Sequence, residues 1–338
     1  MTGITNSEHA APTLEDVALV AGVSRATVSR VVNGGTRVAP ETIDTVRKAI
    51  SELHYHPNRA ARALVTRRTG AIAVLVPEGD ERVFSDPFFP QAYHGALQGF
   101  GGSDVQVVLV MAQPGDSAQR MVRYLESGHV DGAIIVSHHG PTLARALANT
   151  PQPVVFIGDP ESVGMYYVDV DQVTAARTAT EHLIARGARR IGTITGPMDM
   201  AAAIQRLRGF EEAMTAAGLD ASLRADGDFT TIGGSAAAER MLARQPELDG
   251  LFVANDLMAA GAMRFVEDAG RRVPEDVMVI GFDDSAVALQ TVPTLTTMTN
   301  PASELARIAA EMLSEILAGH TPQSPVMLAS RLILRQST

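Results

Sequence analysis

The sequence predicts a small all-α head with a helix-turn-helix, followed by a larger α/β core. Two observations lead to this prediction. Residues 13–53 contain three short helical patterns separated by turn signals, and from Ala71 onward short β-rich runs alternate with longer amphipathic helical patterns. Such alternation indicates parallel sheets covered by helices on both faces. A chain of 338 residues has room for the head and for a core of two lobes.

The first helix of the head is expected to begin after Thr13, whose hydroxyl can cap it while Asp16 reaches back or faces the positive helix end. Residues 22–24, Gly-Val-Ser, mark a turn, because Gly permits a positive φ and Ser can cap a second helix over residues 25–33. The third helix begins at Pro40, and its apolar face consists of Ile43, Val46, Ile50 and Leu53. Three small helices are therefore predicted to share one core.

The outer face of the second helix carries side chains that suit base reading. Its three valines must face the core of the head, and the side chains left outside are Arg25, Ala26, Ser29 and Arg30. In the major groove an Arg fork can pair with a guanine edge, and small side chains can touch thymine methyl groups. A helical hairpin with a solvated polar face would show the same spacing, so the spacing alone leaves both interpretations open.

A longer motif surrounds this helix. Residues 13–36 read TLEDVALVAGVSRATVSRVVNGGT, and residues 37–70 continue RVAPETIDTVRKAISELHYHPNRAARALVTRRTG. The run resembles the lac-repressor family of bacterial regulators, and the resemblance extends over nearly the whole chain. It implies a homodimer that reads a near-palindromic operator and a periplasmic-binding-protein-like core that binds a small-molecule effector. The head residues assigned to DNA are Ser24, Arg25, Ala26, Thr27, Ser29, Arg30, Asn33 and Tyr55.

Residues 57–65 form a short Ala-rich segment after the head. Isolated helices below about 12 residues are marginal, so we expect this segment to be disordered until it pairs. The resemblance implies a hinge helix that folds in the minor groove against its dimer mate. Leu64 would wedge between central base pairs there, with Asn58 and Arg62 beside it. An ordinary linker is the alternative.

The core begins with a strand at residue 71. Strands are predicted at 71–76, 105–110, 132–136, 154–157, 190–195, 251–254 and 277–281. Helices between them include 93–100, 173–186, 207–217 and 258–268. We expect a head over residues 1–56, a hinge and linker over 57–69, and an effector-binding core over 70–338. The expected first lobe covers about 70–170 and 300–328, and the second about 171–299 and 329–338.

Polar side chains stand where parallel sheets bind ligands, just after the strands. Asn255 and Asp283 follow predicted strands, Asp171 ends the run Tyr-Val-Asp-Val, and Arg206 begins a helix. A carboxylate and an Arg fork suit vicinal hydroxyls, which offer a donor and an acceptor together. Helix capping by Asn255 and Asp283, and a surface ion pair of Arg206, are the alternatives.

The resemblance adds to this site. It implies effector contacts at the positions of Arg206, Asn255 and Asp283, with stacking by an aromatic pair, Phe88 and Phe89. Together with Asp171 these residues form the predicted effector site. The chain departs from many relatives after the fourth strand, where it has Gly158 and then Asp159 instead of an acid directly after the strand. The polar contacts of that lobe therefore stay open.

Charge is unevenly placed along the chain. The formal net charge is −10, but residues 1–69 carry nine Arg and Lys against six acids, a net of +3 that leaves −13 for the rest. A basic head on an acidic body suggests that only the head touches phosphates, because the field of the body repels them. An excess of three charges can also arise by chance.

Composition excludes several classes of protein. No apolar run approaches the ~20 residues needed to cross a bilayer, and the polar first residues contain no secretory signal, so a cytoplasmic protein is expected. Without Cys there are no disulfides, thiolate nucleophiles or Cys-based zinc sites. The pairs His138-His139 and His54 with His56 lack a third ligand at suitable spacing, so we expect no metal and no other cofactor.

We therefore expect a transcriptional repressor, not an enzyme, whose effector is a sugar or oligosaccharide. The strings NRAARALVTRRT (58–69), GPMDM (196–200) and RLRGF (206–210) are similar to cellobiose-responsive repressors of actinobacteria. The last residues show no leucine heptads, so a dimer is expected. A sugar hydrolase with Asp171 and Asp283 as paired acids and a sugar-binding transport protein are the rivals from other classes. Purines and sugar phosphates also remain as effectors.

Overall fold

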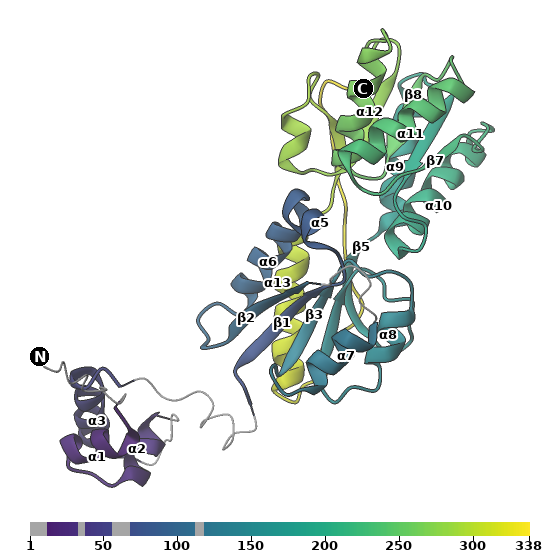
Figure 1. Cartoon of the computed structure of the whole chain (residues 1–338). Helices are drawn as coiled ribbons and strands as arrows, with labels where there is room; N and C mark the ends of the chain where they lie inside the picture. Colours follow the sequence, from purple (N-terminus) through teal and green to yellow (C-terminus); the bar gives the residue numbers. More distant parts are fainter. Residues whose placement is uncertain (1–11, 33–37, 56–67, 112–117) are drawn as a thin grey trace, which may run out of the picture. The chain divides into compact units, whose positions relative to one another are not determined.

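The computed structural model describes residues 12–32, 38–55, 68–111 and 118–338 (Figure 1). Contacts divide the chain after Thr69 into two compact units, an N-terminal head and a core from Gly70 to Thr338. None of the helices in the described parts of the chain is long and apolar enough to cross a membrane.

The described residues of the head form three helices, α1 Leu14–Ala21, α2 Arg25–Val32 and α3 Pro40–Glu52. Helix α1 begins as predicted, because the Thr13 hydroxyl accepts a hydrogen bond from the Asp16 amide at 3.3 Å and the Asp16 carboxylate accepts one from the Thr13 amide at 2.8 Å. Gly22 ends α1 with a φ of 64°, which favours glycine. At the centre of the head lies one fully buried residue from each helix, namely Val17, Val28 and Val46.

The first lobe of the core contains one parallel sheet. Its described strands number six and lie in the order β11-β5-β4-β3-β1-β2. These strands are β1 Ala71–Val76, β2 Gln106–Met111, β3 Gly132–Val136, β4 Val154–Ile157, β5 Tyr166–Val170 and β11 Val326–Leu328. The helices of this lobe are α5 Asp80–Ser85, α6 Phe88–Gly99, α7 Ala118–Glu126, α8 Thr142–Leu147 and α13 Ala302–Leu317.

Strand alternation sends the side chains of β1 to two helix layers. Ile72, Val74 and Val76 pack with α6 and α13, whereas Ala73 and Leu75 pack with α7 and α8. Because both faces of the sheet are covered, β1 is apolar along its whole length. Helices α6 and α13 approach each other so closely that a Cβ on Gly95 would lie 1.9 Å from the Ser303 carbonyl oxygen.

The second lobe repeats this plan. Among its described residues six strands lie in the order β12-β10-β9-β8-β6-β7, and β12 is antiparallel to its neighbour. The strands are β6 Ile191–Thr195, β7 Arg224–Asp226, β8 Gly250–Val253, β9 Met278–Asp283, β10 Thr296–Thr299 and β12 Leu332–Ile333. The helices are α9 Gln172–Ala185, α10 Ala201–Ala216, α11 Thr231–Arg244, α12 Asp256–Asp268 and the short η1 Ala286–Leu289. Helices α9 and α10 cover one face of the sheet, and α11 and α12 cover the other.

Within residues 118–338 the chain passes between the lobes three times, from β5 to α9, from β10 to α13, and from β11 to β12. The three crossings are hydrogen-bonded to one another. The Asp171 amide donates to the Leu328 carbonyl at 3.3 Å, and the Ser330 hydroxyl donates to the Thr299 carbonyl at 2.6 Å. The residues that follow the strands of both sheets therefore come together beside these crossings.

Candidate functional site

Helix α2 presents a polar face away from the core of the head. Val28 is fully buried, while Arg25, Ala26 and Arg30 are exposed, as the spacing predicted. The Arg25 guanidinium forms an ion pair with Glu15 of α1, with 2.8 Å between Nε and Oε1. Arg25 is therefore held by a partner on the neighbouring helix in the unbound head.

Some of the other predicted DNA contacts stabilise the fold of the head. The Ser24 hydroxyl accepts a hydrogen bond from the Thr27 amide at 3.2 Å and lies 2.9 Å from the Thr27 hydroxyl, so both side chains stabilise the start of α2. Ser29 is half-buried. Tyr55 is 6% exposed and packs in the core of the head, and its contact with DNA stays a prediction. The remaining predicted contacts lie outside the described residues, namely Asn33, Asn58, Arg62 and Leu64.

A cavity lies between the two lobes of the core. The space not filled by atoms is ≈ 670 Å³, including open solvent at its mouth. The first lobe and the crossings contribute Arg82, Asp86, Phe88, Phe89, Ser137, His138, Ile157, Gly158, Asp159, Asp169, Asn300 and Leu305. The second lobe contributes Gln172, Met200, Ala201, Ala202, Arg206, Phe229, Asn255 and Asp283.

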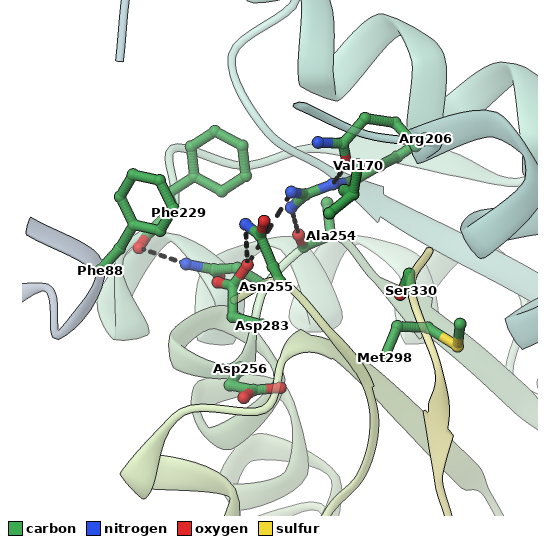
Figure 2. Close-up of polar contacts among 12 residues, drawn as sticks. Phe88, Val170, Arg206, Phe229, Ala254, Asn255, Asp256, Asp283, Met298 and Ser330 are labelled. Atoms are coloured by element: carbon green, nitrogen blue, oxygen red, sulfur yellow. Dashed lines mark hydrogen bonds and ion pairs between the residues drawn. The ribbon is translucent and has the colours of Figure 1, made fainter. Parts of the chain in front are cut away.

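Arg206 lies in the cavity wall on α10 and is 4% exposed. Its Nε donates to Gln172 Oε1 at 2.8 Å, one terminal nitrogen donates to the Ala254 carbonyl, and the other lies 3.8 Å from Asp283 Oδ1 (Figure 2). Its guanidinium carbon lies 3.7 Å from the centre of the Phe282 ring, a cation–π contact. A surface ion pair is thereby excluded, and the fork is fixed in one orientation.

Asp283 ends β9 opposite Arg206. Its Oδ1 accepts a hydrogen bond from Asn300 Nδ2 at 3.0 Å, and its φ of 110° lies in the left-handed region, where a residue with a side chain is strained. Burial raises the pKa of Asp283 to about 8, although the nearby Arg206 charge opposes the shift. At neutral pH the carboxyl group therefore carries its proton for much of the time and can donate as well as accept.

Asn255 both caps a helix and lines the cavity. Its Oδ1 accepts a hydrogen bond from the Met258 amide at 2.9 Å, which caps α12, and its Nδ2 donates to the Phe229 carbonyl at 3.1 Å (Figure 2). The capping interpretation of Asn255 is therefore right. By joining α12 to the loop that carries Phe229, Asn255 also positions that ring.

Asp169, and not Asp171, is the acid of β5 in the cavity. Asp171 lies where the chain turns into α9, and its carboxylate accepts a hydrogen bond from the Thr174 amide at 2.9 Å as the helix cap. Asp169 is 3% exposed and accepts hydrogen bonds from Gln172 Nε2 at 2.8 Å and from the Asp159 amide at 3.1 Å. Burial raises the pKa of Asp169 to about 6. The assignment of Asp171 to the effector site is corrected accordingly.

Aromatic rings line the cavity from both lobes. Phe88 and Phe89 begin α6 with their ring centroids 5.8 Å apart, and Phe229 reaches the cavity from the second lobe (Figure 2). The Arg82 guanidinium carbon lies 5.2 Å from the Phe229 ring centre and 5.8 Å from that of Phe89. Apolar ring faces and a cation thus share one wall.

Several cavity residues carry unsatisfied polar atoms. Among the described residues five buried side-chain polar atoms lack a hydrogen-bond partner, and three of them belong to cavity residues, namely Arg82 Nε, His138 Nδ1 and Asn300 Oδ1. Buried polar groups nearly always find partners in proteins, so these three atoms are exceptions in residues of the cavity wall. Sequence reasoning missed Arg82, His138, Asp169, Phe229 and Asn300 as cavity residues.

Comparisons with known proteins place these features in a family. Residues 13–58 match the model of bacterial regulatory proteins of the lacI family, and residues 180–338 match the periplasmic-binding-protein-like domain. The HTH-type transcriptional regulator CelR of Thermobifida fusca is 42% identical over 96% of this chain and 98% of its own length. The chain belongs to the lacI family. This assignment makes it a DNA-binding transcriptional regulator with an effector-binding core, and it confirms the predicted fold class.

Solved structures agree with the assignment of this lacI-family regulator. A CelR–cellobiose complex is 40% identical, with a TM-score of 0.75 over 97% of this chain and all of that chain. A lac repressor dimer bound to operator and the anti-inducer ONPF is 28% identical, with a TM-score of 0.87 over 97% of this chain and 99% of that chain. The PurR repressor of Aliivibrio salmonicida is 32% identical over 90% of this chain and 91% of its own length.

The family assignment decides between the rivals. As a lacI-family transcriptional regulator the chain is not an enzyme. The hydrolase alternative needs Asp171 and Asp283 as paired acids in one site, and Asp171 lies outside the cavity. The head that matches the lacI-family model excludes a plain sugar-binding transport protein.

Proposed function

We propose that this regulator is a homodimeric repressor whose effector is cellobiose or a short cello-oligosaccharide, and that the effector releases it from a near-palindromic operator in the cytoplasm. The similarity to CelR and to its cellobiose complex supports the choice of sugar. The lac repressor dimer on its operator supports the DNA target and the dimer.

The proposed class of effector, a neutral sugar, rests on the charged groups and aromatic rings of the cavity wall. Four carboxyl groups line it, those of Asp86, Asp159, Asp169 and Asp283, whereas each of its two guanidinium groups already donates to a protein acceptor and only Arg82 Nε is without one. A phosphate group would meet a surplus of acids. An uncharged sugar instead offers hydroxyls to the carboxyl groups and ring faces to the phenylalanines. The wall therefore favours a neutral sugar over a sugar phosphate.

The DNA contacts of the proposed repressor come from the head and the hinge. Arg25 and Arg30 on the outer face of α2 would read base edges in the major groove. Asn58, Arg62 and Leu64 would contact the minor groove, and this part of the proposal rests on the sequence resemblance. A ligand that favours closed lobes would disfavour paired hinge helices and hence DNA.

A binding titration tests this function. Operator DNA is selected from a random library by the protein itself, and its release is followed by fluorescence anisotropy with cellobiose, ribose, hypoxanthine and glucose 6-phosphate. Release by cellobiose at the lowest concentration is expected. Release by hypoxanthine or by glucose 6-phosphate alone would overturn the sugar assignment, and an unselective library would overturn the repressor function.

A further inference from the structure

At the rim of the cavity one histidine contacts both lobes. His139 follows β3 in the first lobe, and its Nδ1 lies 3.0 Å from Asp199 Oδ2 in the loop before α10 of the second lobe. Its Nε2 lies 3.0 Å from Oε1 of Glu78, which follows β1 in the first lobe. The imidazole ring therefore stands between two carboxylates that belong to different lobes.

The partner in the first lobe is a fixed anion. Glu78 is 8% exposed, and its Oε1 also accepts hydrogen bonds from Arg82 and from the Ser137 hydroxyl, both at 2.7 Å. Burial alone would raise the pKa of Glu78, but the hydrogen bond from His139, the Arg82 charge and the Ser137 hydrogen bond together lower it. Glu78 is thus ionised and rigid, and it fixes the ring of His139 toward the second lobe.

Protonation decides how well His139 can serve both carboxylates. A neutral imidazole carries one N–H, so one of its nitrogens would direct a lone pair at a carboxylate oxygen. The imidazolium donates from both nitrogens, and each hydrogen bond is then charge-assisted. The hydrogen bond to Glu78 raises the pKa of His139 most, burial opposes this, and the hydrogen bond to Asp199 raises it further. Moving the second lobe away would remove the Asp199 contribution.

The other groups at the rim behave differently. Burial lowers the pKa of the neighbouring His138, which contacts the Asp159 carbonyl, so His138 stays neutral. Two more hydrogen bonds link the lobes among the described rim residues, from the Gly140 amide to the Asp199 carbonyl at 2.6 Å and from Gln205 to the Asp159 carboxylate at 3.2 Å. Neither of these two hydrogen bonds needs a proton from solution.

We propose that His139 positions the two lobes against each other by bridging Glu78 and Asp199, and that its protonation favours the closed core and strengthens effector binding. The effector part rests on the function proposed above. Because the bridge is complete only with the lobes together, linkage requires protonation and closure to favour each other. Affinity for the effector therefore falls as the pH rises through the pKa of His139 in the closed core.

Lobe closure can be measured without any effector. The chain has no native Cys, so the double variant Val163→Cys/Ile232→Cys places one spin label on an exposed site of each lobe. Excess unlabelled protein ensures that any dimer carries one labelled subunit. Double electron–electron resonance measures the distance between the two labels. The fraction of molecules with the distance of the closed core is expected to fall from pH 5.5 to pH 8.5. A distance distribution that stays the same over this pH range would overturn the proposal.

Two variants and two controls separate positioning from mere stability. His139→Gln and Asp199→Asn are each expected to remove most of the pH dependence, and Asp199→Asn keeps the Gly140 hydrogen bond because that bond uses the backbone. His94→Gln removes an exposed histidine of α6, and Glu247→Gln removes a carboxylate that pairs with Arg190 in its own lobe. Both controls should titrate like the wild type. If the closed population of His139→Gln and of Asp199→Asn depends on pH as in the wild type, the proposed bridge is wrong.

Cellobiose binding by calorimetry completes the test. Affinity of the wild type should fall about three- to tenfold from pH 6 to pH 8 relative to His139→Gln, and this comparison cancels the titration of Asp169 and Asp283 in the cavity. If cellobiose does not bind at any pH but closure still depends on pH, cellobiose is rejected as the effector and the His139 bridge is retained. If cellobiose binds with the same pH profile in the wild type and in His139→Gln, the His139 bridge is rejected and cellobiose is retained as the effector.

Discussion

Arg25 must leave a partner before it can read a base. Its ion pair with Glu15 is exposed on both sides, with side chains 70% and 59% accessible, so water and salt weaken it and the exchange for a guanine edge costs little. We predict that Arg25→Ala lowers operator affinity by about 1–3 kcal/mol and changes affinity for scrambled DNA much less. Anisotropy titrations on both DNAs at one salt concentration measure the difference.

A charge-matched control belongs with this prediction. Arg208→Ala removes one positive charge from an exposed site of the core, where Arg208 pairs with Glu212, and should leave both affinities unchanged. Equal losses on operator and scrambled DNA for Arg25→Ala would mean that Arg25 contacts only phosphate.

Asp283 offers a sharper test because two substitutions should differ. With its pKa raised to about 8 by burial, the carboxyl group is largely neutral at pH 6.5, and Asp283→Asn keeps a neutral group of the same shape. We predict that Asp283→Asn still responds to cellobiose at pH 6.5, whereas Asp283→Ala binds operator but is no longer released. Operator titrations with and without cellobiose decide this. Loss of operator binding in Asp283→Ala without sugar would make the residue structural.

The same residue predicts a pH dependence of stability. The folded core holds a proton on Asp283 up to about pH 8, whereas the unfolded chain loses it near 3.8, so the folded state binds more protons between these values. The free energy of unfolding of the wild type should therefore fall relative to Asp283→Asn as the pH rises from 5 to 8. Thermal unfolding at several pH values measures it, and a constant difference between the two proteins would show that the carboxyl is already ionised.

Sequence reasoning reached part of the cavity wall. Asn255 precedes α12 and Asp283 ends β9, where local patterns are visible, whereas Arg206 lies five residues inside α10 and not at the helix start that was predicted. All three line the cavity. Asp171 was predicted and Asp169 was missed, because the point where the chain turns from β5 into α9 decides which carboxylate faces inward. Arg82, His138 and Phe229 reach the wall only through the packing of the two lobes, which no local pattern encodes.

At the scale of elements, close helix contacts should be the most sensitive features. Gly95 lets α6 approach α13, and a Cβ there would lie 1.9 Å from backbone of Ser303, which cannot move like a flexible side chain. We predict that Gly95→Ala destabilises the core by about 1–3 kcal/mol or more, as overpacked sites do. Thermal unfolding of the full chain is the measurement.

Gly79 provides the matched control. It stands before α5 with a φ of −69°, and a Cβ there meets nothing within 4 Å. Gly79→Ala should leave the unfolding temperature nearly unchanged or raise it slightly, because Ala restricts the unfolded chain. Equal effects of the two substitutions would mean that α6 and α13 can separate without loss.

Elements were predictable where their patterns are long or strongly apolar. Strands β1, β3 and β4 match the predicted 71–76, 132–136 and 154–157, because buried strands of a parallel sheet are apolar on both faces. Helix α13 was not predicted although it has 16 residues, and the short edge strands β7 and β11 carry too few residues to show a period. Their place in the sheets is fixed by pairing with distant segments.

For the whole molecule, the proposed coupling between effector and operator must be reciprocal. If cellobiose weakens operator binding by a given factor, operator must weaken cellobiose binding by the same factor, and typical couplings of about 1–3 kcal/mol correspond to roughly 5- to 150-fold. We predict this equality for the full-length protein. Calorimetry with cellobiose in the presence and absence of saturating operator tests it, and unequal factors would reveal a second bound state.

The three crossings between the lobes set the mechanics of the core. They lie side by side and are joined laterally by hydrogen bonds such as that from Ser330 to Thr299. Bending all three together preserves these bonds, whereas sliding or twisting one lobe against the other would stretch them. These bonds therefore favour a change of the angle between the lobes over other relative motions. A small molecule that acted on this angle would change the separation of whatever is attached to the two lobes.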